Sequence, residues 1–147
     1  MIAEIQPSFS SSATMVRKVA YQLTKIEQGD ARVLCTSTND ELHTMPEYMR
    51  LIAETNERVK LPYTEFILSL YPGEILTDKE WLSLAEKYIQ RMGYGRCCYA
   101  VVLNTDKAHQ HVHVLLTTID EDGKSVSSSN NYRRSEKISR ELEQEYG

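Results

Sequence analysis

Residues 97–119 of the chain read CCYAVVLNTDKAHQHVHVLLTTI, two apolar runs joined by a short polar loop. Each run, 97–103 and 110–119, is rich in β-branched and other apolar residues and has the length of a β-strand. The loop from Asn104 to His109 can join neighbouring antiparallel strands, whereas parallel strands need a crossover of about a dozen residues or more. This stretch therefore predicts a β-hairpin.

Further strand and helix patterns surround this hairpin. We expect strands at residues 2–5, 31–36 and 61–70. Helical periodicity predicts helices at residues 13–26, 44–59, 77–92 and 132–146, with capping boxes at Thr44/Glu47 and Thr77/Glu80. Because these elements do not alternate as regular βαβ units, we expect an α+β fold, a central antiparallel β-sheet with helices packed on it. Residues 1–147 are expected to form a single domain.

Composition limits the classes of function. The 147 residues carry a net charge of -4 with a sequence pI of about 5.6, which argues against a protein that holds DNA by bulk positive charge. No apolar run approaches the roughly 20 residues of a membrane helix, and the N-terminus does not resemble a signal peptide. Cys35, Cys97 and Cys98 form no spacing pattern, which argues against a disulfide framework. These features favour a cytoplasmic protein with reduced thiols and no membrane partner.

Three of the four histidines, His109, His111 and His113, lie in the second half of the hairpin. Alternate side chains of a strand share a face, so the three imidazoles are expected to project together. Imidazoles in this arrangement suit a divalent transition metal such as Zn, Mn, Ni or Cu. All three would span roughly 13 Å on a straight strand, so two reach one ion more easily than three unless the strand starts after His109. The competing interpretation is an exposed edge strand that happens to carry histidines.

The hairpin resembles the histidine motif of the conjugative relaxases, the nucleases of plasmid mobilisation. Their motif has the form His-x-Asp-x-x-His-x-His-x-His, and residues 104–113 here read NTDKAHQHVH. The serine-rich turn at residues 8–12, which precedes a helix with a tyrosine, resembles the first motif of the family. The segment 61–74 resembles the approach to the middle motif. The resemblance covers almost the whole chain, and it favours a relaxase over a rolling-circle replication initiator, which uses the same histidine and tyrosine chemistry.

The resemblance implies metal-dependent nicking of one DNA strand at the transfer origin of a plasmid or mobile element. Tyr21 corresponds to the nucleophile, which leaves a 5′-phosphotyrosine and a free 3′-hydroxyl. Taken alone, a helix tyrosine is usually a packing residue, as we expect for Tyr48, Tyr63 and Tyr88. The implied metal ligands are His109, His111 and His113, the residues beside them are Asp106 and Asn104, and the implied DNA-backbone contact is Ser69.

The family also implies a cofactor and partners. The expected cofactor is a divalent metal, Mg or Mn in function, with Zn or Ni as other candidates. The expected partners are single-stranded DNA at a transfer origin and accessory proteins of the relaxosome. Relaxases are usually longer, so the chain is expected to be the N-terminal part of a longer protein.

The chain departs from the family pattern at two positions. Asn104 stands where the family commonly has its third histidine ligand, and Glu65 stands where relatives often have a histidine. With Asn104, the site either uses His109 as its third ligand, favours a hard ion such as Mg, or binds metal poorly. Glu65 is within reach of the site as an oxygen ligand, although a surface or capping role is its ordinary reading. The alternative function is a relaxase-like DNA-binding module with weakened cleavage.

Overall fold

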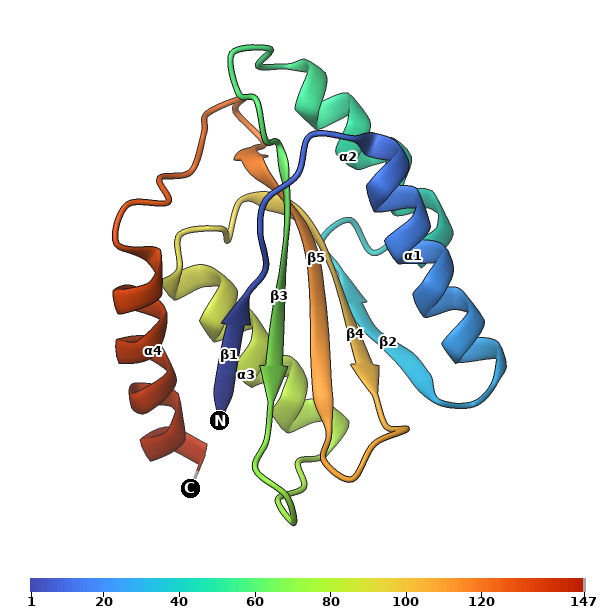
Figure 1. Cartoon of the computed structure of the whole chain (residues 1–147), viewed down its shortest axis with the longest axis vertical. Coiled ribbons are helices and arrows are strands. Elements are labelled where there is room, and N and C mark those ends of the chain that lie inside the picture. The colour runs from blue at the N-terminus through green and yellow to red at the C-terminus, as the bar shows by residue number, and fades with distance from the viewer. Residues whose placement is uncertain (147) are drawn as a thin grey trace.

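The strands form one sheet in the order β1-β3-β5-β4-β2, with every neighbouring pair antiparallel (Figure 1). The computed structural model describes residues 1–146, and Gly147, the last residue of the expected single domain, lies outside the described residues. The predicted hairpin is confirmed as β4 and β5, which pair with each other. The strands are β1 Ile2–Ile5, β2 Ala31–Thr36, β3 Tyr63–Ser69, β4 Cys97–Asn104 and β5 His111–Asp120.

Helices cover both faces of this sheet (Figure 1). Helices α1 and α2 contact each other over one face, and α3 and α4 contact each other on the opposite side. The helices are α1 Ser12–Glu27, α2 Met45–Glu54, α3 Asp78–Arg91 and α4 Asn131–Tyr146, and a short 3-10 helix, η1 Leu42–Thr44, precedes α2. The expected α+β fold is therefore confirmed.

The pleat of β5 divides its side chains between two cores. Val112, Val114 and Leu116 pack in the core that α3 and α4 cover. Leu115 packs in the core beneath α1 and α2. His111 and His113 have the same strand parity as Leu115 and therefore face the α1 side of the sheet. This alternation brings the two histidines beneath the helix that carries Tyr21.

Helix α2 differs from its prediction at both ends. The capping box expected at Thr44 is wrong, because Thr44 already has helical backbone angles (φ -87, ψ -15) as the last residue of η1, and an N-cap residue needs an extended backbone. Its hydroxyl donates to the carbonyl of Glu41. The helix ends at Glu54 rather than at 59, and the side chain of Asn56 then donates to the carbonyl of Gly123.

The capping box at Thr77 is confirmed. The Thr77 hydroxyl accepts from the backbone N–H of Glu80, and the Glu80 carboxylate accepts from the backbone N–H of Thr77. This reciprocal pair fixes the start of α3 next to the loop that follows β3.

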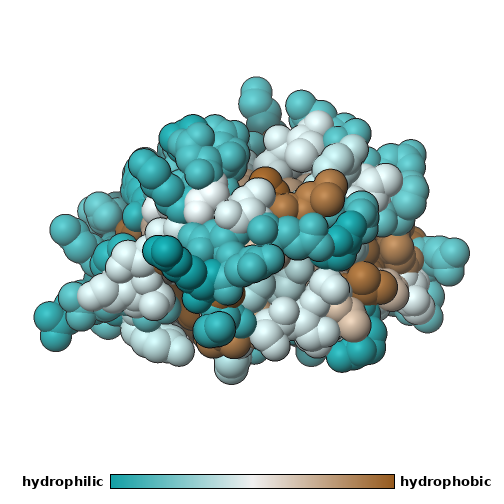
Figure 2. Space-filling view, turned by 90° about the horizontal axis from the view of Figure 1, so that it is seen from above, coloured by the Kyte–Doolittle hydropathy of each residue, from teal (hydrophilic) through white to brown (hydrophobic). Residues whose placement is uncertain are grey.

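The face seen in Figure 2 carries scattered rather than continuous apolar areas. Seen from the end of the sheet opposite the β4–β5 loop, hydrophilic groups predominate and the apolar areas are small (Figure 2). Within residues 1–146, none of the helices combines the length and apolar character needed to cross a lipid bilayer.

Candidate active site

The candidate site lies on the α1 side of the sheet, near the β4–β5 loop. In the strand register Ile67 pairs with His113, and Ser69 pairs with His111. On the other side of β5, His111 pairs with Asn104 of β4. Three adjacent strands therefore present polar side chains to one area of the sheet, under α1.

The three histidines do not share one regular strand. β5 begins at His111, so His109 lies in the loop before it. The rings of His111 and His113 are 5.2 Å apart between centroids, and those of His109 and His111 are 6.1 Å apart. Within residues 1–146, no group of three His, Cys, Asp or Glu side chains is arranged to hold a metal ion. The closest-spaced pair of rings is His111 with His113.

Glu65 of β3, for which the sequence allowed either an oxygen ligand of the site or a surface or capping role, lies within this site. Its side chain is buried, with the residue 6% exposed, and its Oε2 lies 2.7 Å from Nδ1 of His113. Its Oε1 accepts a hydrogen bond from Nζ of Lys18 on α1, also at 2.7 Å. Burial alone would raise the pKa of Glu65, but the hydrogen bonds from His113 and Lys18 outweigh it and lower that pKa. An ionised carboxylate only accepts, so Nδ1 of His113 is the donor in this hydrogen bond, which in a neutral ring leaves the lone pair on Nε2.

Asn104 is tied to the tyrosine helix. It is fully buried, and its Nδ2 donates to Oε1 of Gln22 at 2.9 Å. The Oδ1 of Asn104 and the Nδ1 of the neighbouring His111 are both buried without a hydrogen-bond partner in residues 1–146. Burial lowers the pKa of His111, and nearby His113 lowers it further, which favours the neutral ring that can act as a ligand.

The sequence contains features that indicate buried, hydrogen-bonded roles for Glu65 and Gln22. Glu65 interrupts an otherwise apolar strand pattern, and a carboxylate inside a predicted strand needs a partner if its face is buried. Gln22 follows Met15 and Val19 at helical spacing, and these three residues form the buried face of α1. A polar residue in an apolar helix stripe is a similar signal.

Tyr21 stands on α1 beside that buried face and is itself 59% exposed. It lines a cavity of about 270 Å³ together with Lys25, Ser69 and Lys107, and the cavity also contains all three histidines, His109, His111 and His113. An adjoining cavity of about 390 Å³ is lined by Tyr21 and His113 as well. Five of the residues that the family resemblance implied therefore line one cavity: Tyr21, Ser69, His109, His111 and His113.

Asp106 contacts α1 rather than a histidine. Its Oδ2 lies 2.6 Å from Nζ of Lys25, and that ammonium stands 5.4 Å from the centre of the Tyr21 ring. Burial lowers the pKa of Lys25, but the hydrogen bond and charge of Asp106, together with the nearby Tyr21, outweigh this effect and the pKa is raised. The β4–β5 loop thus holds a charged lysine beside the phenol.

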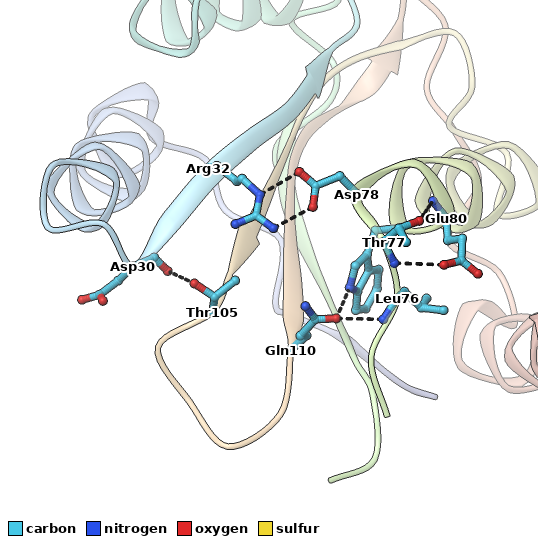
Figure 3. A network of polar contacts seen from close by, with 9 residues as sticks. Asp30, Arg32, Leu76, Thr77, Asp78, Glu80, Thr105 and Gln110 are labelled. Atoms are coloured by element: carbon cyan, nitrogen blue, oxygen red, sulfur yellow. Dashed lines mark hydrogen bonds and ion pairs between the residues drawn. The ribbon is translucent and has the colours of Figure 1, made fainter. Parts of the chain in front are cut away.

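A polar network fixes the end of the hairpin against α3 (Figure 3). Gln110, between His109 and His111, accepts through Oε1 from the backbone N–H of Leu76 and from the indole N–H of Trp81. Nearby, Arg32 of β2 forms a two-pronged ion pair with Asp78 at the start of α3. The segment that carries the histidines is therefore anchored on the face opposite to them.

A larger cavity, of about 510 Å³, lies elsewhere. Tyr48, Leu51 and Cys98 are among its lining residues, at the start of β4 rather than at its end. None of the histidines lines this cavity, so the larger volume does not coincide with the cluster of histidines and Tyr21.

Comparisons with known proteins agree with the fold. Residues 21–147 match the family of relaxases described as MobA/VirD2-like, nuclease domain. The chain therefore belongs to the MobA/VirD2-like relaxase nuclease family. A solved structure described as "Molecular Basis of Vancomycin Resistance Transfer in Staphylococcus aureus" is similar over 100% of this chain and 95% of its own, with a TM-score of 0.54 and 14% identity. At that identity the likeness shows the fold alone. None of the curated proteins matches.

Proposed function

We propose that this chain nicks one strand of DNA at the transfer origin of a plasmid or mobile element, with Tyr21 as the nucleophile. The observation that carries the proposal is that Tyr21 and the three histidines line one cavity. An exposed phenol beside imidazoles that can bind a metal ion is suited to attack a phosphodiester. The family of relaxase nucleases supplies the class of substrate.

The reaction exchanges one phosphoester for another. The Tyr21 oxygen forms a bond to the scissile phosphorus, and the bond from that phosphorus to the 3′ oxygen breaks. The phenol loses its proton and the 3′ oxygen gains one, which leaves a 5′-phosphotyrosine and a free 3′-hydroxyl. Since an unperturbed phenol has a pKa of about 10, attack at neutral pH needs positive charge nearby. Lys25, 5.4 Å from the ring centre, supplies part of that charge.

A divalent ion, Mg or Mn, fits next to the paired histidines. His111 and His113 would hold it, since their rings are 5.2 Å apart and Glu65 leaves Nε2 of His113 free. The buried Oδ1 of Asn104, an acceptor beside His111, has no hydrogen-bond donor in residues 1–146, and a cation is one species that satisfies such an atom. His109, in the adjoining loop, is the remaining imidazole within reach. Bound there, the ion would stabilise charge developing on the phosphate oxygens.

Local positive charge supports DNA as the substrate although the net charge of the chain is -4. The two cavities that share Tyr21 are lined by Arg17 and Lys107, and by Lys18 and Lys25, which form ion pairs with Glu65 and Asp106. Phosphate contacts from such residues position a strand without reading its sequence. Ser69 lines the same hollow and is our candidate for a backbone contact. Relaxosome accessory proteins are the proposed further partners.

A second candidate function is a DNA-binding module with weakened cleavage. One observation favours it: the Asn104 amide is engaged by Gln22, where the family commonly has a histidine ligand. A site with two strand-borne imidazoles would hold its metal less tightly than one with three.

The two candidates separate in one gel experiment. A labelled single-stranded oligonucleotide carrying the transfer origin of the element that encodes the chain is incubated with protein and Mn or Mg. The nicking proposal expects a protease-sensitive, slow-migrating adduct that survives denaturation and is lost in Tyr21→Phe and with a chelator. Tyr132→Phe, at an exposed tyrosine of α4, is the matched control and should retain the adduct. Binding without adduct would favour the module.

A further inference from the structure

The row of side chains that faces the site continues past the end of β3. Ser69 pairs with His111, and the backbone N–H of Leu70 donates to the carbonyl of Gln110 at 3.1 Å, which extends the ladder by one residue. β3 ends at Ser69 and β5 begins at His111, but the same register, continued by two residues, would set Tyr71 opposite His109. Strand alternation would then put Tyr71 on the same side as Ser69, while Leu70 is buried in the opposite core.

The backbone of Tyr71 is held in a tight turn. Its carbonyl accepts from the backbone N–H of Glu74 at 3.1 Å, and its own N–H donates to the Glu74 carboxylate at 3.2 Å. Gly73 takes the positive φ (+89) that this turn requires. At the far end of the turn, Leu76 is bound to Gln110 of the histidine hairpin (Figure 3). The turn is therefore fixed relative to the histidines.

The Tyr71 side chain is nevertheless exposed, at 48%. Ile75, in the same loop, is also exposed. Two residues of extended chain span roughly 6.6 Å, so Tyr71 lies within about that distance along the chain of Ser69, which lines the cavity that holds the histidines. An exposed aromatic ring on a hydrogen-bonded turn, two residues from a cavity lined by Lys25 and Lys107, has the arrangement that proteins use to stack unpaired bases while cations hold the phosphates.

We infer that Tyr71 is a stacking platform for one unpaired base of single-stranded DNA, adjacent to the phosphate held near the histidines. The inference rests on the proposed function, because it takes the site to bind DNA. The inference adds to the site a residue that positions the DNA strand. It assigns the ring of Tyr71, not its hydroxyl, as the group that contacts the DNA base.

Equilibrium binding of a labelled transfer-origin oligonucleotide, measured by fluorescence anisotropy, tests the inference. Loss of one stacked base is expected to raise Kd by roughly 5- to 100-fold in Tyr71→Ala. Tyr71→Phe keeps the ring and should bind like the unaltered protein, as should the matched control Tyr132→Ala on α4. The slope of log K against log salt should stay the same, because stacking releases no counterions.

A scan of single abasic positions along the oligonucleotide locates the base. At one position, removing the base should weaken binding by the unaltered protein. At that position the unaltered protein and Tyr71→Ala should then bind with the same affinity. Equal binding by Tyr71→Ala and the unaltered protein at every position, with the Tyr21 adduct intact, would overturn the inference and leave the proposed function standing. Equal losses in Tyr71→Phe and Tyr71→Ala would assign the hydroxyl and overturn stacking. No DNA binding by the unaltered protein would overturn both.

Discussion

The carboxylate of Glu65 bridges Nδ1 of His113 and Nζ of Lys18, each at 2.7 Å, and so connects β5 to the tyrosine helix through a buried acid. A carboxylate on one imidazole nitrogen fixes the ring orientation and makes the other nitrogen a better ligand. The same carboxylate neutralises a lysine that would otherwise stand beside the site. Glu65 therefore acts on the site through His113.

Replacing this carboxylate should weaken metal binding. Glu65→Gln keeps the size of the side chain but removes the charge, and we expect Mn affinity to fall by about 10- to 100-fold, as for other partners of metal-bound histidines. Titration calorimetry with Mn measures the change. Glu4→Gln is the matched control, since Glu4 lines the histidine cavity but forms no hydrogen bond to a histidine within residues 1–146. Unchanged affinity in Glu65→Gln would remove Glu65 from the site.

Asn104→His should raise metal affinity and lower stability together. The position is fully buried next to His111, so an imidazole there would add a ligand. It would also displace the hydrogen bond to Gln22 and overfill a packed position, which costs about 1–3 kcal/mol. Metal titration and urea denaturation of the same sample report the two effects. A folded variant with unaltered Mn affinity would put position 104 outside the site.

Gln110→Ala should destabilise the hairpin end without touching the cavity. It would leave the N–H groups of Leu76 and Trp81 without an acceptor, and we expect a loss of about 2–4 kcal/mol in the free energy of unfolding. Gln110→Glu retains an acceptor oxygen and should stay within about 1 kcal/mol of the unaltered protein in urea denaturation. If the two variants were equally stable, the Gln110 side chain would not be what anchors the hairpin.

Local patterns in the sequence predicted much of the fold. The apolar runs on either side of residues 104–109 gave the central hairpin, and the Thr77/Glu80 pair gave the start of α3. The error at Thr44 has a local cause as well. Its spacing to Glu47 fits a capping box, but η1 already gives Thr44 a helical backbone, and Glu47 instead pairs with Arg50.

The site was harder to predict because its contacts are long-range. The bond from Glu65 to His113 joins residues 48 apart in sequence, and the bond from Gln22 to Asn104 joins residues 82 apart. Spacing within one segment contains no information about such pairs; the sheet order β3-β5-β4 and the position of α1 create them. The place of His109 could not be predicted from the histidine spacing either, because that spacing does not determine that β5 begins at His111.

The most direct test of the central claim is to identify the residue that becomes attached to DNA. After reaction with the transfer-origin oligonucleotide and Mn, the protein is denatured and digested with nuclease and trypsin, and its peptides are examined by mass spectrometry. Cleavage after Lys18 and Lys25 gives the peptide VAYQLTK, in which Tyr21 is the sole tyrosine, whereas Tyr71 falls in the peptide 61–79. We predict that the nucleotide mass is carried by VAYQLTK, on Tyr21. A nucleotide on the peptide 61–79 or on any other peptide would contradict the assignment of Tyr21 as the nucleophile.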